Sequence, residues 1–260
     1  MNVTKDVSVV IPVFNAEKFI DRTLSSVALQ TELPLEVIVV DDGSSDATCS
    51  VVEIFGNKNP QINLRLLRGE HGGPGHARNM GVNAAKGSWI AFLDSDDLWY
   101  PNKLLAISLA HRTSLESNIL CHNELHRQLQ GTESVLDYSK YFQPNVPLTQ
   151  QLYKNNCLST SAVICRRELI LSCGGFDVFL SNAQDYELWI KMSPHLKIYF
   201  VKQVLGVYVD RAGNISSNRK WGKYKNVIRV LHRHRNKVKA SVYLRAIIRV
   251  TASYIYRSIF

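Results

Sequence analysis

The sequence predicts an α/β fold built on a doubly wound, mostly parallel sheet. Three observations support this fold class. Over the first hundred residues, short runs rich in Val, Ile and Leu alternate with segments of helical periodicity. The runs contain few polar residues, as expected of strands that are buried on both faces of a sheet. Each run ends in a polar or glycine-rich cluster, and ligands of such sheets bind at the carboxyl ends of the strands.

The first part of the chain is expected to repeat a strand followed by a helix. Each strand is an apolar run, and each helix spaces its apolar residues three or four positions apart. Pro12 ends the first run, because proline has no N–H for a sheet ladder. Strands are expected at 7–12, 35–40, 63–67 and 89–93, and helices at 16–30, 48–55, 76–85 and 103–114.

The pattern is weaker after residue 114. Residues 128–156 are polar and rich in turn-forming residues, so an irregular insertion is expected there. The helix expected at 184–192 buries Leu188, Trp189 and Met192 on one side. The other expected elements are strands at 119–127 and 157–165, a short helix at 166–171, and a pair of strands within 198–209.

The clearest chemical signal is the segment Asp94-Ser95-Asp96-Asp97, directly after the apolar run at 89–93. Three carboxylates within four positions repel one another, and a cation relieves that repulsion. Mg²⁺ and Mn²⁺ are the natural partners of oxygen ligands. The alternative is a polar turn that caps the next helix, because Asp is a good N-cap residue. The position behind a buried strand favours the metal site.

Polar residues also follow the other strands of the expected parallel sheet. They are Asn15 after the first strand, and Asp41 and Asp42 after the second. Because parallel strands end at one edge, these side chains are expected to meet the Asp94–Asp97 cluster there. The glycine-rich loop 69–75 follows the third strand but lacks the Gly-Lys-Ser/Thr ending of a P-loop. It either approaches an anion with Arg78 nearby, or is a mobile connector whose arginine pairs with an acid.

The charges are distributed unevenly along the chain. Residues 1–210 contain all 22 Asp and Glu and 18 of the 31 Lys and Arg, a net charge of −4. Residues 211–260 contain the other 13 Lys and Arg and no acid, a net charge of +13. The chain is therefore expected to be a mildly acidic globule with a strongly basic tail.

The basic tail has the pattern of an amphipathic helix. Its polar positions recur every four residues, at Lys237, Ser241, Arg245 and Arg249, between apolar residues. Such a helix can lie on an anionic membrane surface, which is the favoured interpretation. The alternatives are packing of its apolar side on the rest of the protein and nucleic-acid binding. The acidic body and the lack of a nucleic-acid motif argue against nucleic acid.

Other features of the composition narrow the class of protein. No uncharged apolar run is long enough to span a bilayer, and the N-terminus lacks a signal-peptide pattern. Five cysteines without paired metal spacing indicate a reducing setting. They are Cys49, Cys121, Cys157, Cys165 and Cys173. A cytoplasmic protein is expected, held at the cytoplasmic face of the membrane by its tail.

Five polar motifs occur in sequence along the chain. They are Val-Ile-Pro-Val-Phe-Asn (10–15), Val-Asp-Asp-Gly-Ser-Ser-Asp (40–46), Gly-Pro-Gly-His-Ala-Arg-Asn (73–79), Phe-Leu-Asp-Ser-Asp-Asp (92–97) and Gln-Asp-Tyr-Glu-Leu-Trp (184–189). Their order and spacing resemble family 2 glycosyltransferases. The resemblance implies a GT-A fold and a nucleotide-sugar donor, with a UDP-sugar favoured. It divides the chain into a GT-A domain (1–212) and the basic helical tail (213–260). Within the domain, 1–100 would bind the nucleotide sugar and 101–212 the acceptor, a glycan or a lipid-linked saccharide.

The resemblance also implies roles for the matching residues. Asp96 would bind Mn²⁺ or Mg²⁺, and Asp185 would be the base of an inverting transfer. Asp42 would read the base edge, and Asp94 would lie near the ribose. The implied nucleotide-sugar site comprises Pro12, Phe14, Asn15, Asp41, Asp42, Arg78, Asp94 and Ser95. Asp97 is left to cap or support the helix that follows it. An N-cap or first-turn acid remains the simpler interpretation of Asp185 taken alone.

Two departures from the family pattern affect these expectations. Gln184 occupies the place where the family usually has Glu before the base, and activity is expected to survive the change. No Gln-x-x-Arg-Trp motif of processive synthases follows Asp185, and Arg211 is the nearest basic candidate. Transfer of a single sugar is therefore expected. The alternatives are a nucleotidyltransferase of similar fold and a catalytically silent sugar-nucleotide-binding protein.

Overall fold

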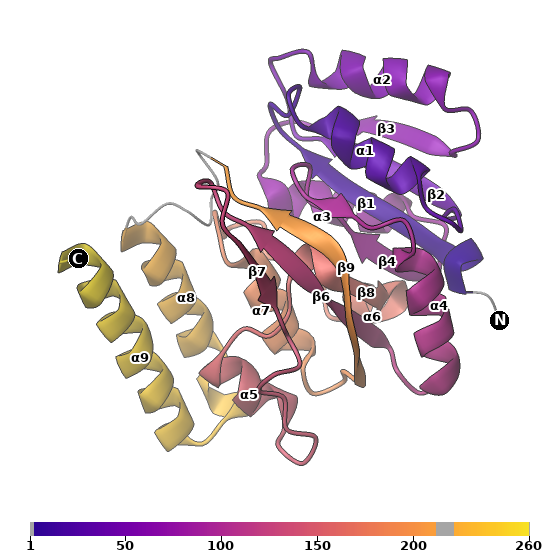
Figure 1. The fold of residues 1–260 in the computed structure, drawn as a ribbon. Coiled ribbons are helices and arrows are strands. Elements are labelled where there is room, and N and C mark those ends of the chain that lie inside the picture. The colour runs from indigo at the N-terminus through magenta and orange to yellow at the C-terminus, as the bar shows by residue number, and fades with distance from the viewer. Residues whose placement is uncertain (1–2, 212–220, 260) are drawn as a thin grey trace.

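The structure, a computed structural model, describes residues 3–211 and 221–259. In these residues nine strands form one sheet with helices on both faces (Figure 1). The strand order is β3-β2-β1-β4-β8-β6-β9-β5, and β7 pairs with β6 beside this path. The strands are β1 Val7–Val13, β2 Glu36–Asp41, β3 Leu64–Arg68, β4 Trp89–Phe92, β5 Leu98–Trp99, β6 Ile119–Arg127, β7 Glu133–Leu136, β8 Val163–Arg166 and β9 Ile198–Val209.

The first four strands of this order form the doubly wound half of the sheet. β3, β2, β1 and β4 are all parallel, so their carboxyl ends lie at one edge. The other half is mixed, because β8 runs antiparallel to both β4 and β6, while β9 is parallel to β6. The short strand β5 is antiparallel to β9. The predicted fold class, an α/β fold with a mostly parallel sheet, is confirmed.

Side chains of alternate strand residues build two cores, one on each face of the sheet. In β1, Val9 and Ile11 face one core and Val10 faces the other, as the period of a strand requires. The first core is covered by α1 Ile20–Ala28, α2 Thr48–Lys58 and α4 Lys103–Thr113. The second is covered by α3 Pro74–Ala84, α5 Leu148–Lys154, α6 Arg167–Ser172, α7 Gln184–Met192, α8 Trp221–Arg233 and α9 Ala240–Ile259.

The two C-terminal helices pack on the second core. Val230 of α8 and Ala246 of α9 are buried in the same apolar cluster as α5 and α7. Polar contacts add to this packing, since the Tyr153 hydroxyl donates to the Leu231 carbonyl (2.8 Å) and Arg249 donates to the Tyr153 carbonyl (3.0 Å). Among the described residues, no helix combines the length and the apolar character that crossing a bilayer requires. The expected helical extension is therefore present, and one side of it packs on the rest of the protein.

Three expected elements differ from the structure. The segment 128–156, expected to be irregular, contains β7 and α5. β7 is exposed and pairs with β6 through its backbone, so it shows no apolar periodicity, while α5 is too short to show one. The strand expected at 157–165 begins only at Val163, after a 3₁₀ turn at Thr160–Ala162. The pair of strands expected within 198–209 is the single strand β9, whose pairing with β6 is irregular near its middle.

Candidate active site

The loops after β1 and β2 meet at the carboxyl edge of the sheet. Asn15 adopts φ 49°, a left-handed conformation that Asn tolerates better than most residues. Its N–H donates to the Ser44 hydroxyl (2.9 Å), and its side-chain oxygen accepts from the Ser45 N–H (2.9 Å). Asp41 accepts from the Ser44 N–H (3.2 Å), which fixes the same turn from within. The polar residues that follow the first two strands are therefore joined, as predicted.

Asp42 lies at the centre of the next group of contacts. Its carboxylate is 3% exposed and accepts the N–H groups of Gly72 and Gly73, both at 2.9 Å. The imidazole Nδ1 of His71 lies 2.9 Å from the same carboxylate. The His71 ring in turn lies 4.4 Å from the ring of Phe14, which is 46% exposed. The glycine-rich loop therefore folds over the Asp42 carboxylate. Its residue His71 also contacts the ring of Phe14, which is largely open to solvent.

Pro12 explains the position of Phe14. It is buried in β1 opposite Val40 of β2, so it belongs to the sheet and not to the loop. The strand ends at Val13, and Phe14 follows at the edge with its ring exposed. The strand therefore does not end at Pro12, as was expected, but continues to Val13, and Phe14 offers a surface on which a planar group can stack.

Arg78 and Asp94 form the second half of the site. Arg78, in the first turns of α3, is 7% exposed and donates from Nη2 to Asp94 Oδ1 at 2.6 Å. Its guanidinium lies 5.5 Å from the ring centroid of Phe176, which also packs edge-on against Phe92. The Asp94 N–H donates to the Ser161 hydroxyl (3.1 Å). Of the two alternatives for the glycine-rich loop, the structure shows the pairing of Arg78 with an acid, and the approach of the loop to an anion stays a prediction.

Asp96 makes an ion pair with Arg211, which ends the first described range. The Arg211 guanidinium lies 4.6 Å from the centroid of the Phe19 ring. Burial raises the pKa of Asp96 above its usual range, the charge of Asp94 raises it further, and Arg211 opposes both. Ser95, between the two acids, is buried, and its carbonyl accepts from the Thr23 hydroxyl (2.8 Å). The backbone at Ser95 thus holds the segment in place, and the Asp96 carboxylate pairs with the Arg211 guanidinium.

The expectation for Asp97 was wrong. Its carboxylate accepts from the Ser161 hydroxyl (2.6 Å) and from the Val209 N–H (3.0 Å), so it ties the end of β4 to β9. The helix that follows begins only at Lys103, with Asn102 at the N-cap position and no side-chain capping bond. Burial raises the pKa of Asp97 well above its usual range. Its partners lie far away in the sequence, which is why local capping rules could not identify its role.

Asp185 lies in the first turn of α7, half-buried. Desolvation raises the pKa of Asp185, with the positive charge of Arg78 lowering it and the negative charge of Asp94 raising it. It therefore lies within electrostatic reach of Arg78 and Asp94, although both are far away in the sequence. Both expectations for Asp185, a general base and a first-turn acid, stay predictions.

Gln184 supports the turn that leads into α7. Its side-chain amide is buried and donates to the Leu180 carbonyl at 2.8 Å. The next residue back, Ala183, has φ 60°, so the turn contains a left-handed residue without the freedom of glycine. The hydrogen bond to the Leu180 carbonyl needs a donor, and an ionised Glu at position 184 would have no hydrogen to donate.

Replacing Gln184 by Glu is expected to lower the free energy of unfolding by about 1–3 kcal/mol at neutral pH. The new carboxylate would be buried against a carbonyl oxygen, so its pKa would rise above that of the unfolded chain. The folded state would then bind the proton more tightly, and the deficit should shrink as the pH falls toward 5. Urea unfolding at pH 7 and pH 5 measures both effects. An equal deficit at the two pH values would contradict the hydrogen-bond role.

The comparisons with known proteins identify the family of the chain. The sequence profile of glycosyl transferase family 2 matches residues 8–155, more than half of the chain. The chain belongs to glycosyl transferase family 2. This membership decides against the nucleotidyltransferase alternative. The family resemblance seen in the motif order is confirmed.

A curated family 2 relative is the Escherichia coli UDP-Glc:alpha-D-GlcNAc-diphosphoundecaprenol beta-1,3-glucosyltransferase WfgD. It is 31% identical over 190 residues, which cover 72% of this chain and 69% of WfgD. Among solved structures, Staphylococcus aureus TarS 1–349 in complex with UDP-GlcNAc superposes with a TM-score of 0.75 at 25% identity, over 94% of this chain and 71% of TarS. The mannosyltransferase PcManGT from Pyrobaculum calidifontis, in complex with GDP-Man and Mn²⁺, superposes with a TM-score of 0.67 at 19% identity, over 96% of this chain and 69% of PcManGT. The fold is therefore the GT-A fold of this family.

Several curated relatives are longer than this chain. Three uncharacterized glycosyltransferases from Rickettsia match 76% of it at 29–31% identity, while it spans 29% to 62% of their length. The similarity therefore concerns the shared GT-A domain and not the activity of the longer proteins as a whole.

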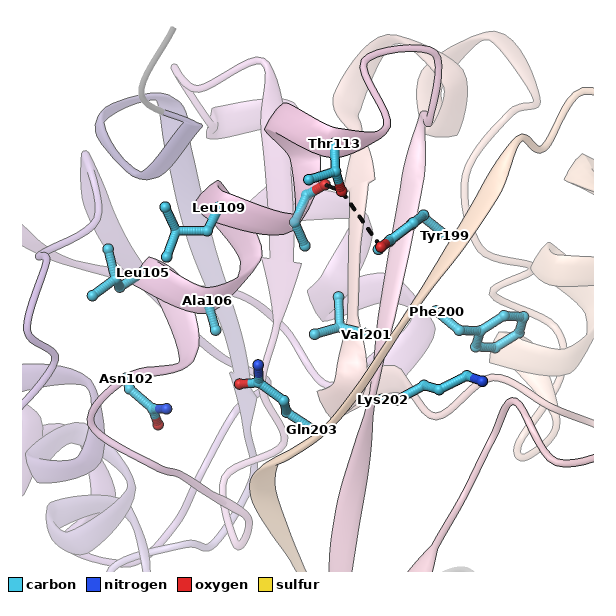
Figure 2. Close-up of a pocket in the computed structure, with 11 residues that line it drawn as sticks. Asn102, Leu105, Ala106, Leu109, Thr113, Tyr199, Phe200, Val201, Lys202 and Gln203 are labelled. Atoms are coloured by element: carbon cyan, nitrogen blue, oxygen red, sulfur yellow. Dashed lines mark hydrogen bonds between the residues drawn. The ribbon is translucent and has the colours of Figure 1, made fainter.

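A groove elsewhere on the family 2 domain contains none of the predicted site residues. It lies between α4 and β9, has a volume of about 710 Å³, and is lined by Leu105, Leu109, Tyr199 and Val201 among others (Figure 2). The Thr113 hydroxyl donates to the Tyr199 hydroxyl across one end (3.4 Å). The polar groups that converge at the carboxyl edge of the sheet, and not this groove, therefore define the candidate site.

Three residues of the site were missed by sequence reasoning. His71 contacts both Asp42 and Phe14, and its position inside the glycine-rich loop was the available signal. Ser161 bonds the Asp94 backbone and the Asp97 carboxylate, and Phe176 lies beside Arg78. The last two come from segments remote in sequence, and nothing in their local pattern marks them.

Proposed function

We propose that the chain is an inverting, metal-dependent glycosyltransferase. It moves one sugar from a nucleotide sugar, a UDP-sugar in the first instance, to a hydroxyl group of a glycan or lipid-linked saccharide. The observation that carries the proposal is that Asp94 bonds Arg78 and that both charges act on Asp185, while Asp42 follows the neighbouring strand β2 at the same edge of the sheet. The UDP-GlcNAc complex of TarS supports the donor class, and the activity in the name of WfgD supports the lipid-linked acceptor.

The nucleotide would bind at Phe14 and Asp42. The exposed Phe14 ring offers a stacking surface for the base. The Asp42 carboxylate is held by two backbone N–H groups, so its position is fixed before the donor arrives. A carboxylate accepts from the N3–H of uracil, whereas cytosine presents an acceptor at the same ring position. This chemistry favours UDP over CDP as the carrier.

The residues at the end of β4 fit a divalent ion. Asp94 and Asp96 are carboxylates two positions apart, each neutralised by one arginine. Mg²⁺ is commonly held by one or two carboxylates together with the phosphates of the substrate, and Asp94 and Asp96 supply two such carboxylates. A bound ion would offset the negative charge that develops on the departing diphosphate.

Asp185 would act as the general base. Inversion requires the acceptor hydroxyl to attack from the face opposite the leaving group, so the base must lie across the donor from the metal. Asp185 comes from α7, whereas Asp96 follows β4, and Arg78 with Asp94 lies within reach of Asp185. Burial keeps the carboxylate a stronger base than an exposed aspartate, which favours removal of the hydroxyl proton.

Transfer of a single sugar follows from what the chain carries beyond Asp185. The motif of processive synthases does not occur there, and the first arginine after Asp185, Arg211, pairs with Asp96. A panel of nucleotide sugars tests the proposal, measured as the rise in melting temperature with Mn²⁺ present and as transfer to a lipid-linked saccharide. One UDP-sugar is expected to stabilise the protein and to support transfer. Equal stabilisation by every nucleotide sugar, with no transfer from any, would contradict the proposal.

Replacing Arg211 by Ala is expected to strengthen Mn²⁺ binding about tenfold in the absence of donor. The reason is that the ion would no longer compete with a guanidinium for the Asp96 carboxylate, and a charge-assisted hydrogen bond contributes roughly 1.5 kcal/mol. Electron paramagnetic resonance of free Mn²⁺ measures the affinity without turnover.

Arg22→Ala is the matched control for this experiment. Arg22 lies near the same Phe19 ring and donates to the Asp96 carbonyl (3.3 Å), but it does not touch the carboxylate. Its replacement should leave the Mn²⁺ affinity unchanged. Equal affinities in the wild type and the Arg211 variant would show that the two cations do not share Asp96.

A further inference from the structure

The outer face of α9 combines exposed apolar residues with basic ones. Leu244, Ile248 and Ile255 are 56%, 67% and 51% exposed, and their spacing places them along one stripe of the helix. Arg245 and Arg249 follow a neighbouring stripe and are exposed as well. α9 is the outermost element on its side of the molecule (Figure 1). A helix that served only to cover the core would not need this apolar stripe.

The inner face of α9 is already occupied. Ala246 and Val250 are buried in the core, and Tyr243 and Tyr254 pack against it. His232 of α8 bonds the Tyr243 hydroxyl (3.1 Å), and Arg249 reaches the Tyr153 carbonyl of α5. Packing and surface association are therefore not alternatives for this helix, because each uses a different face.

The Lys and Arg residues of the tail are not balanced by acids of the tail. Residues 211–260 contain 13 Lys and Arg and no acid. Arg233 and His234 are used inward, on Asp177 and Glu187. Lys239 and Arg245 are exposed and form no ion pair within the described part of the chain. A second copy of this face would meet it with like charge, which disfavours self-association.

We infer that the outer face of α9, defined by Leu244, Arg245, Ile248 and Ile255, lies on an anionic lipid surface. The apolar stripe enters the boundary between headgroups and acyl chains, while Lys239 and Arg245 contact lipid phosphates. No described helix is suited to crossing the bilayer, so the helix lies along the surface. The inference does not depend on the proposed chemistry, although a lipid-linked acceptor would be found at the same surface.

Co-sedimentation of the full chain with lipid vesicles tests the inference without any turnover. Binding is expected to vesicles of phosphatidylcholine with phosphatidylglycerol, to be at least about tenfold weaker to phosphatidylcholine alone, and to fall with added salt. The triple variant Leu244→Ser, Ile248→Ser, Ile255→Ser should bind at least about tenfold more weakly, since it removes the apolar anchor. The variant Lys239→Gln, Arg245→Gln should lose the preference for the anionic lipid.

The control replaces exposed apolar residues away from α9. Leu115→Ser, Leu129→Ser and Val135→Ser remove side chains that are 74%, 62% and 57% exposed, and vesicle binding should not change. Thermal unfolding verifies that each variant is folded. Equal binding of the wild type and the α9 triple variant would overturn the inference. Equal binding of the wild type to anionic and neutral vesicles would overturn it as well. A dimer seen by light scattering that the triple variant abolishes would assign the face to a second copy instead.

Discussion

Replacing Asp185 by Asn is expected to lower sugar transfer by about 10²–10⁴-fold while leaving donor binding intact. Asn keeps the size and the position of the side chain but cannot take the proton of the acceptor hydroxyl. The neighbouring Arg78–Asp94 pair lies within electrostatic reach and keeps its own 2.6 Å hydrogen bond. The change should therefore appear in kcat, with the Kd of UDP-sugar near its wild-type value by isothermal titration.

The pH dependence of transfer gives a second test of the same role. Burial raises the pKa of Asp185, so the protonated, inactive form persists to a higher pH than for an ordinary aspartate. Activity should fall as the pH drops through this raised pKa, and the residual activity of the Asp185→Asn variant should lack that acid limb. Asp137→Asn is the control, because Asp137 is exposed, accepts from the Ser139 hydroxyl in its own turn, and has its pKa lowered by the bonds of that turn. Near-normal kcat in the Asp185→Asn variant, or loss of its donor affinity, would contradict the assignment.

The first half of the fold could be predicted because its signals are local. β1, β2, β3 and β4 are apolar runs, and their ends carry the polar residues that parallel pairing brings to one edge. The second half depends on partners distant in sequence. β7 is exposed and is held by backbone bonds to β6, and β5 is two residues long, so neither leaves a periodic pattern.

The residues of the candidate site also fall into two groups, those marked by a local motif and those identified only by contacts in the folded chain. Asp42, Asp94 and Asp185 were recognisable because each lies in a motif next to a strand end or a helix start. Ser161 and Phe176 were not, since their importance arises from contacts with Asp94 and Arg78 that only the folded chain makes. Asp97 shows the limit most clearly. Its place in a D-S-D-D segment suggested a helix cap. In the structure its buried carboxylate bonds Ser161 and Val209 and so links separate parts of the sheet.

Replacing Asp96 by Asn is expected to remove the metal-dependent part of donor binding and to lower turnover by about 10²-fold or more. A bound ion contributes several kcal/mol to stabilising charge in the transition state, and each 1.36 kcal/mol is a factor of ten in rate. The Asn side chain can still accept a hydrogen bond from Arg211, so the end of β9 should stay in place. Titration of UDP into the variant with Mn²⁺ and with EDTA should give the same Kd, whereas the wild type should bind more tightly with Mn²⁺.

The variant Asp94→Asn distinguishes the loss of a metal ligand from the loss of the acidic partner of Arg78. Asp94 pairs with Arg78 at 2.6 Å, so its replacement leaves a 7% exposed guanidinium without its charged partner. UDP binding should then change in EDTA as well as in Mn²⁺, because the disturbance does not depend on the ion. If Asp96→Asn behaved in the same way, with binding altered equally in both conditions, Asp96 would be a structural partner of Arg211 and the ion would have to bind elsewhere. A loss confined to Mn²⁺ is what a direct ligand requires, since only the ion distinguishes the two titrations.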